Sequence, residues 1–181
     1  NEVNIGTPIP GVEIKIVGSD GCEIMDGSPG ELHVRGPNVM LGYFRQPELT
    51  EAVIDKDGYL NTGDIVSVNS KQEMVVQGRT KELIIRSGFN VYPPEIEAAL
   101  NTHPAVLNSA VVGRSIEGNE EIVAFVEPVP GCHIEIDTLF ALLDEQLARY
   151  KKPQKIIVMS QLPVAPNGKI RKNDLKKYAE A

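Results

Sequence analysis

The order of apolar and polar residues changes near position 80 and divides the chain into two parts. In the first part, apolar side chains alternate with polar ones, as over residues 12–16 and 32–35, and turn-forming pairs such as Asp57-Gly58 separate the runs. A two-residue period is typical of strands that bury one face. The pattern predicts a small antiparallel β unit, with one short helix beginning near Pro47.

The second part mixes helical patterns with strand patterns. A helix is predicted from Pro93 to His103. Proline is favoured in a first helical turn, which suits Pro93 as the start. Pro104 disfavours helical conformation in the residue before it, so the helix is expected to end at His103. A second helix is expected to start at an Asp137 cap and to carry an apolar stripe that reaches Tyr150. A polar helix is expected over 172–181.

Apolar runs around these helices predict one short strand, two buried strands and a third strand after them. The runs cover residues 83–86, 106–112, 122–126 and 155–160. Buried strands with helices beside them predict a three-stranded sheet covered by helices. The fold class is therefore α+β, with a β-rich domain over 1–79, a second domain over 80–181 and the boundary at 78–81.

The composition is that of a globular protein and excludes some functional classes, but it does not identify an activity. Of the 181 residues, 41% are hydrophobic and 24% charged, which is typical of a globular protein. The sequence shows no apolar run of transmembrane length and no cluster of metal-ligating residues, so neither a membrane span nor a metal site is predicted. Its two cysteines, Cys22 and Cys132, favour a reduced intracellular protein, and we expect it in the cytoplasm.

Basic residues are concentrated near the end of a chain whose net charge is −7. Residues 149–177 hold nine lysines and arginines and a single acidic residue, Asp174. One interpretation is a solvated basic face, which is the usual meaning of such a run. The other is a binding surface for a polyanion such as ATP or coenzyme A. Nucleic acid is not an expected partner, because the rest of the chain is acidic and aromatic residues are few.

Two residues on either side of a strand pattern are candidates for holding a nucleotide. Asp64 ends the motif Thr62-Gly63-Asp64, and a carboxylate can accept hydrogen bonds from both hydroxyls of one ribose. Arg79 follows fifteen positions later and can reinforce that grip or bind a phosphate. The alternatives are an Asx-turn at Asp64 and a surface arginine that pairs with Glu73 or Glu82.

Two lysines suggest motion and charge neutralisation. Lys169 follows the turn-forming triplet Pro166-Asn167-Gly168, and its long stem suits a positive charge that reaches a reaction centre elsewhere. Lys81 lies where the pattern changes, close to Gly78, which is where a hinge would be placed. The alternative for Lys169 is an exposed turn lysine with a structural role or none. The alternative for Lys81 is a plain linker.

Taken in order, the motifs resemble those of one family, the AMP-forming acyl-CoA synthetases of the adenylate-forming superfamily. The segment over 91–97 resembles the corresponding segment of fatty-acid and related CoA ligases more closely than that of the adenylation domains of peptide synthetases. Across its whole length the chain resembles the C-terminal third of these enzymes. The matching motifs are residues 30–36, 42–44, 47–50, 62–64, 78–82, 87–97 and 166–169.

The resemblance implies roles for the nucleotide-handling residues. Asp64 and Arg79 would hold the ribose of AMP, and Lys169 would contact the nucleotide and act in the adenylating step. Lys81 would be the hinge about which the second domain rotates between two half-reactions.

The resemblance also implies a site for coenzyme A. The turn Ser87-Gly88-Phe89 is similar to the loop that lines the pantetheine tunnel. Tyr150, Lys151 and Lys152 match, more loosely, a stretch that contacts coenzyme A in some relatives.

The implied reaction joins a carboxylic acid, fatty or related, to coenzyme A at the expense of ATP. The family's phosphate loop, its Thr-Glu pair for Mg²⁺ and its acyl pocket would all precede Asn1, so we expect this segment by itself to be inactive. Two other functions stay open: an adenylating enzyme that loads a carrier protein, and a non-catalytic module that binds a nucleotide or coenzyme A.

Overall fold

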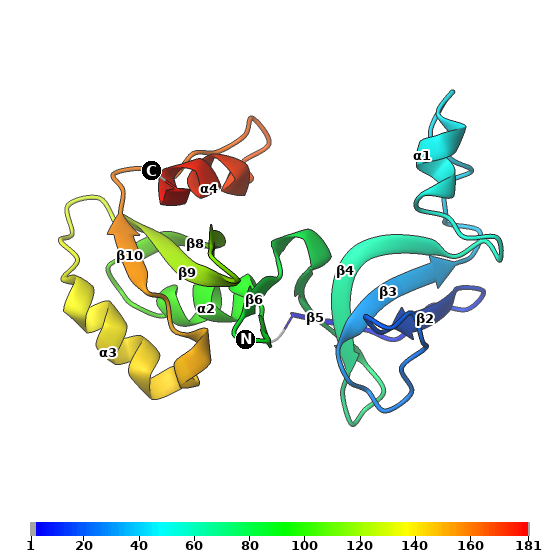
Figure 1. The fold of residues 1–181 in the computed structure, drawn as a ribbon, viewed down its shortest axis with the longest axis horizontal. Helices are drawn as coiled ribbons and strands as arrows, with labels where there is room; N and C mark the ends of the chain where they lie inside the picture. Colours follow the sequence, from blue (N-terminus) through cyan, green and yellow to red (C-terminus); the bar gives the residue numbers. More distant parts are fainter. Residues whose placement is uncertain (1–2, 181) are drawn as a thin grey trace. The chain divides into compact units, whose positions relative to one another are not determined.

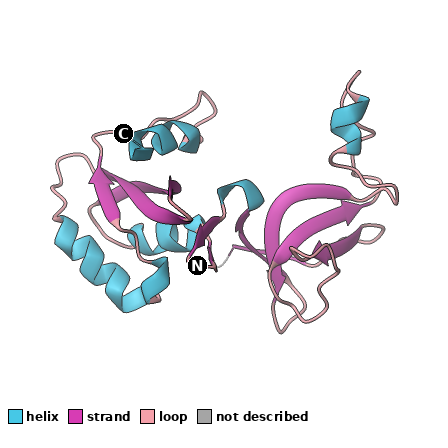
Figure 2. Ribbon diagram, in the orientation of Figure 1, coloured by secondary structure: helices cyan, strands magenta, loops and turns pink. Residues whose placement is uncertain are grey.

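The computed structural model describes residues 3–180 and shows helices and strands throughout (Figure 1 and Figure 2). The chain forms two compact units: the first ends at Lys81 and the second begins at Glu82. Both strand-rich and helix-containing parts are present, which confirms the predicted α+β class.

The first unit is built on a five-stranded antiparallel sheet. Its strand order is β1-β5-β4-β3-β2. Ile16, Leu32, Val66 and Met74 form its buried cluster, because alternate residues of each strand share one face. The strands are β1 (Val3–Gly6), β2 (Glu13–Val17), β3 (Gly30–Arg35), β4 (Leu60–Val68) and β5 (Met74–Arg79).

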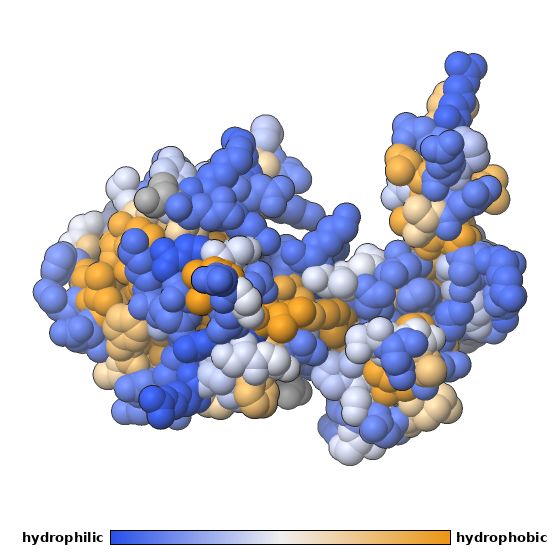
Figure 3. All heavy atoms as spheres, viewed as in Figure 1, coloured by the Kyte–Doolittle hydropathy of each residue, from blue (hydrophilic) through white to orange (hydrophobic). Residues whose placement is uncertain are grey.

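Helix α1 (Pro47–Glu51) begins with the predicted proline and buries none of its residues. Leu41, Phe44 and Leu49, on α1 and in the segment before it, are exposed apolar side chains. The space-filling view shows apolar residues at the surface around this helix (Figure 3).

The second unit is built on a three-stranded sheet with the order β10-β9-β8. Strands β8 (Val106–Ile116) and β9 (Asn119–Pro128) are antiparallel neighbours, and β10 (Lys155–Val158) pairs with β9 in parallel. Both faces of the central strand are covered, and this explains why residues 122–126 are all apolar and buried.

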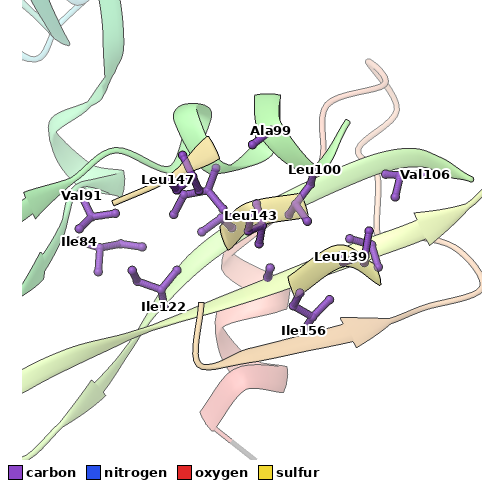
Figure 4. Packing of buried hydrophobic residues seen from close by; sticks show 14 of the residues in the cluster. Ile84, Val91, Ala99, Leu100, Val106, Ile122, Leu139, Leu143, Leu147 and Ile156 are labelled. Atoms are coloured by element: carbon purple, nitrogen blue, oxygen red, sulfur yellow. The ribbon is translucent and has the colours of Figure 1, made fainter. Parts of the chain in front are cut away.

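Helices cover the two faces of this sheet with different sets of side chains. Ile122, Ala124 and Val126 belong to a cluster that includes residues of α2 (Pro93–Leu100) and α3 (Ile136–Gln146), and Figure 4 shows part of it. Val123 and Phe125 belong to a second cluster with residues of α4 (Lys172–Glu180). The period of two along β9 thus separates the two layers of helices.

Short elements connect the units and the helices. A 3₁₀ helix, η1 (Thr80–Glu82), spans the division between the units, and a second, η2 (Arg149–Lys151), follows α3. Strands β6 (Ile84–Arg86) and β7 (Phe89–Val91) pair as an antiparallel hairpin.

Several predicted boundaries are wrong. Helix α3 begins at Ile136 after Glu135, so Asp137 lies in the first turn, where its charge still suits the helix dipole, and does not cap the helix. The helix ends at Gln146, which places Tyr150 in η2 and off the apolar stripe. Position 181, the predicted end of the last helix, lies outside the described residues.

Strands β8 and β9 run past their predicted ends because their pairing continues into polar sequence. Arg114 and Glu121 are direct partners in this ladder and form an ion pair. Opposite charges at facing positions stabilise a strand pair, so the ladder does not stop where apolar residues stop.

Candidate active site

Asp64, in the middle of β4, and Arg79, at the end of β5, form an ion pair. The strand register makes them direct partners, and Nε of Arg79 lies 3.1 Å from Oδ1 of Asp64. The alternative partners of Arg79 are engaged elsewhere: Glu73 accepts from Asn69, and Glu82 pairs with Lys172. Side-chain exposure of 63% for Arg79 and 30% for Asp64 leaves both groups accessible to a ligand.

The turn before Asp64 is formed by other side chains. Oδ1 of Asn61 accepts from the backbone N of Gly63 at 2.8 Å, and Oγ1 of Thr62 accepts from the backbone N of Asp64 at 3.1 Å. Gly63 has a φ of 69°, a conformation that favours glycine. The Asx-turn therefore belongs to Asn61, and Oδ2 of Asp64 has no hydrogen-bond partner among residues 3–180.

Lys169 lies on an exposed hairpin-like loop of the second unit. The backbone N of Ala165 donates to the carbonyl of Lys169 at 2.8 Å, and the backbone N of Lys169 donates to Oδ1 of Asn167 at 3.2 Å. Gly168 has a φ of 79°, as the turn requires. The Lys169 side chain is exposed and forms no ion pair with any residue that the structure describes.

The end of this loop is anchored by a lysine that the sequence analysis did not single out. Nζ of Lys172 lies 2.6 Å from Oε2 of Glu82 and 2.8 Å from Oε1 of Glu97. Burial by itself lowers the pKa of Lys172, but the nearby Glu97 and Glu82 carboxylates outweigh it and raise that pKa. The sequence carries no local signal for this cluster, because both carboxylate partners lie far from Lys172 along the chain.

The structure brings together two of the segments expected to contact coenzyme A. Ser87 and Gly88 form the turn between β6 and β7, with φ values of 50° and 82°, which suits a two-residue hairpin turn. The next residue, Phe89, stacks on Tyr150 of η2 with ring centroids 4.7 Å apart.

Lys151 and Lys152 lie beside this stacked pair and are already paired with acidic side chains. Nζ of Lys151 lies 2.7 Å from Oε1 of Glu95, and Nζ of Lys152 lies 2.5 Å from Oδ1 of Asp144. A phosphate at this position would compete with two carboxylates.

A metal-ion cluster and a membrane-spanning helix are both absent from residues 3–180. No group of three or more histidine, cysteine, aspartate or glutamate side chains within residues 3–180 is arranged to hold a metal ion. No helix in the same part of the chain is long and apolar enough to cross a membrane.

Comparison with known proteins identifies the family. Residues 1–44 match the family described as AMP-binding enzyme, and residues 95–169 match the AMP-binding enzyme C-terminal domain. Indoleacetate–CoA ligase of Aromatoleum aromaticum is 40% identical over 94% of this chain and 34% of its own length. A long-chain-fatty-acid–CoA ligase of Escherichia coli O157:H7 is 38% identical over 97% of the chain and 31% of its own length.

A solved structure gives the same result. ATP-bound MatB of Rhodopseudomonas palustris matches with a TM-score of 0.89 and 36% identity, covering 98% of this chain and 36% of MatB. The apo structure of the same protein covers the same shares with a TM-score of 0.71. The chain thus spans about a third of the length of the relatives it matches. On these matches, which begin at its first strands and extend to the Lys169 loop, the chain belongs to the family of AMP-binding, adenylate-forming enzymes.

Proposed function

We propose that the protein containing this chain is an ATP-dependent carboxylate–CoA ligase that acts on a fatty or related carboxylic acid. The observation that carries the proposal is the accessible Asp64–Arg79 pair, found in a chain whose curated relatives include CoA ligases. In the first half-reaction, a carboxylate oxygen attacks the α-phosphorus of ATP, and the bond to pyrophosphate breaks. In the second, the sulfur of coenzyme A attacks the acyl carbon, and AMP leaves.

The nucleotide is held by the Asp64–Arg79 pair in this proposal. The carboxylate of Asp64 accepts hydrogen bonds from the ribose hydroxyls, since Oδ2 has no partner among residues 3–180. The guanidinium of Arg79 orients that carboxylate through the ion pair. Lys169 supplies an ammonium that offsets negative charge around the α-phosphate, for which an exposed side chain on a turn is suited.

The second domain is proposed to rotate about Lys81 between the half-reactions, with a domain boundary at 78–81. Lys81 is exposed and lies in the 3₁₀ helix η1, where the division between the two compact units falls.

Coenzyme A is proposed to bind along Ser87, Gly88 and Phe89 and beside Tyr150, Lys151 and Lys152. The stacked Phe89–Tyr150 pair supports this assignment, because it joins the two segments into one surface. We place the Mg²⁺ ligands and the acyl pocket in other parts of the protein, and the protein in the cytoplasm.

The complete protein, incubated with ATP, Mg²⁺, coenzyme A and a panel of carboxylic acids, tests the proposal. We expect acid-dependent exchange of pyrophosphate into ATP, followed by acyl-CoA and AMP in equal amounts. Acyl-AMP without acyl-CoA would favour an enzyme that loads a carrier protein. Nucleotide binding without exchange for any acid would favour a non-catalytic module. The 181-residue chain by itself is expected to show no exchange.

A further inference from the structure

The turn between β6 and β7 is strained and is held from outside the hairpin. Ser87 has a φ of 50°, in a region that residues other than glycine, asparagine and aspartate rarely adopt. Such a residue is energetically unfavourable and persists only when its surroundings fix it. The β6–β7 hairpin has only three residues in each strand, which is too short to supply that restraint itself.

Part of the restraint comes from the start of β9. The backbone N of Ser87 donates to Oδ1 of Asn119 at 2.7 Å, and Nδ2 of Asn119 lies 3.3 Å from Oγ of Ser87. The backbone N of Ile85 donates to Oε2 of Glu120 at 2.6 Å. These contacts fix β6 and the turn to the sheet.

The rest comes from Arg86, which joins the hairpin to η2. Its Nη1 donates to the carbonyl oxygen of Tyr150 at 2.9 Å and to that of Lys152 at 2.8 Å. These carbonyls lie at the end of a short helix, where carbonyl groups lack intrahelical partners and a cation is favourable. One partly buried guanidinium therefore satisfies two acceptors and fixes the position of η2.

Arg86 and Phe89 hold the same two segments together from adjacent positions. They are direct partners across the hairpin, on either side of the Ser87-Gly88 turn. Arg86 contacts the backbone of η2, and Phe89 stacks on the Tyr150 ring of the same element. Phe89 is still 54% exposed, so one side of the stacked pair is open to a ligand.

We propose that Arg86 is a positioning residue for the thioester-forming half-reaction. It holds the Ser87–Phe89 turn against Tyr150 and so presents a preformed surface to the thiol substrate. This inference rests on the proposed function, because it assigns Arg86 to the half-reaction that uses coenzyme A. Preorganisation of this kind lowers the ordering cost of binding and is lost when the support is removed.

Arg86→Ala and Arg86→Lys in the complete enzyme test the inference. We expect Arg86→Ala to raise the KM for coenzyme A at least about tenfold and to leave pyrophosphate exchange within about twofold of wild type, since two hydrogen bonds from a charged donor are lost. Arg86→Lys should recover part of the affinity, because an ammonium can still donate to one of the carbonyls. Arg35→Ala is the control, because Arg35 forms an exposed ion pair with Glu13 in the first unit, whereas the hairpin and η2 belong to the second unit.

Amide hydrogen exchange gives a readout that does not depend on activity. Peptides covering residues 84–91 should exchange faster in Arg86→Ala, while peptides of α3 keep their protection. Faster exchange with an unchanged KM for coenzyme A would show that the contact is only structural and would overturn the inference. An equal loss of both half-reactions would overturn it too. If the wild-type enzyme forms acyl-AMP but no acyl-CoA, the proposed function is wrong, and the proposed role of Arg86 toward coenzyme A is wrong as a consequence.

Discussion

Asp64 and Arg79 face each other across β4 and β5 as an ion pair that remains open to solvent. With Arg79 63% exposed, such a pair contributes at most about 1 kcal/mol to folding. Stability is therefore a weak explanation for the arrangement, and ligand binding is a better one. The same sheet contains a second exposed, directly opposed pair, Glu13 and Arg35, which provides a matched comparison.

Asp64→Asn is expected to raise the KM for ATP about tenfold or more, with little change in unfolding temperature. The variant loses the charge that accepts the ribose hydroxyls, and a hydrogen bond to a charged group is worth about 1.5–3 kcal/mol. Pyrophosphate-exchange kinetics and thermal unfolding of the complete enzyme measure the two effects. Glu13→Gln breaks the comparison pair and should leave the KM for ATP unchanged. Equal KM effects in both variants would contradict a ribose-binding role.

Lys169→Ala is expected to slow acyl-AMP formation about a hundredfold while sparing the second half-reaction. Loss of a group that stabilises charge in the transition state typically costs that much. Thioester formation from supplied acyl-AMP should change only slightly, because the turn geometry depends on Asn167 and Gly168. Lys177→Ala removes another exposed lysine of the basic C-terminal region and is the control. A similar loss in both half-reactions would indicate a role in folding.

Lys81→Pro is expected to impair the second half-reaction more than the first, which is the opposite of Lys169→Ala. Proline fixes φ and also restricts the preceding residue, so the change of orientation between half-reactions should be hindered. Acyl-AMP formation should be largely kept, and thioester formation from supplied acyl-AMP should fall severalfold or more. Lys81→Ala removes the charge while leaving the backbone free, so it should behave like wild type in both assays. Two variants with the same profile would argue for a charge effect and against a hinge.

Local sequence patterns predicted most of the helices and strands, because these elements depend mainly on residues that are close together in the sequence. The period of two predicted the first sheet, and the continuous apolar run over 122–126 predicted a strand covered on both faces. The cap of α3 was misassigned because Glu135 occupies the N-cap position without a side-chain bond, which no local pattern distinguishes from an Asp137 cap. Element ends depend on such small differences in free energy.

Contacts between distant positions could not be predicted in the same way. Arg86 contacts residues 64 and 66 positions away, and Asn119 contacts Ser87 across 32 positions. Only the assembled sheet brings these groups together, and a single arginine in a short strand gives no periodic signal. The burial of Lys172 was missed for the same reason, because its two carboxylate partners lie 90 and 75 positions earlier in the sequence.

Lys172→Met is expected to destabilise the second unit by about 1–3 kcal/mol. Removing the ammonium leaves the partly exposed carboxylates of Glu82 and Glu97 without the charge that compensates them, and loss of a hydrogen bond to a charged group costs about that much. Denaturant unfolding measures the loss, which should appear as a lower midpoint. Arg171→Ala breaks only the exposed pair with Asp174 and should lower the free energy of unfolding by less than about 0.5 kcal/mol, with little change in midpoint. Equal midpoints for the two variants would show that the Lys172 cluster carries little stability.

His33 is expected to make the first unit less stable in mild acid. Both ring nitrogens are buried without a partner among residues 3–180. Burial, followed by the charge of Lys15, lowers the pKa of His33, while Glu31 and Asp55 act in the opposite direction. Above the ordinary histidine pKa of about 6.5 neither state binds the proton, and the contribution to stability is complete. As the pH falls below that value, the unfolded chain binds a proton that the folded chain excludes, so the free energy of unfolding decreases.

His33→Phe tests this, since phenylalanine suits a strand and leaves no hydrogen bond unmade. Unfolding midpoints measured from pH 8 to pH 5 should fall less steeply for this variant than for wild type. His133→Gln, at an exposed histidine of the second unit, is the control and should keep the wild-type slope. If His33→Phe keeps that slope as well, the acid sensitivity arises from other groups, and the imidazole of His33 is protonated in the fold at little cost.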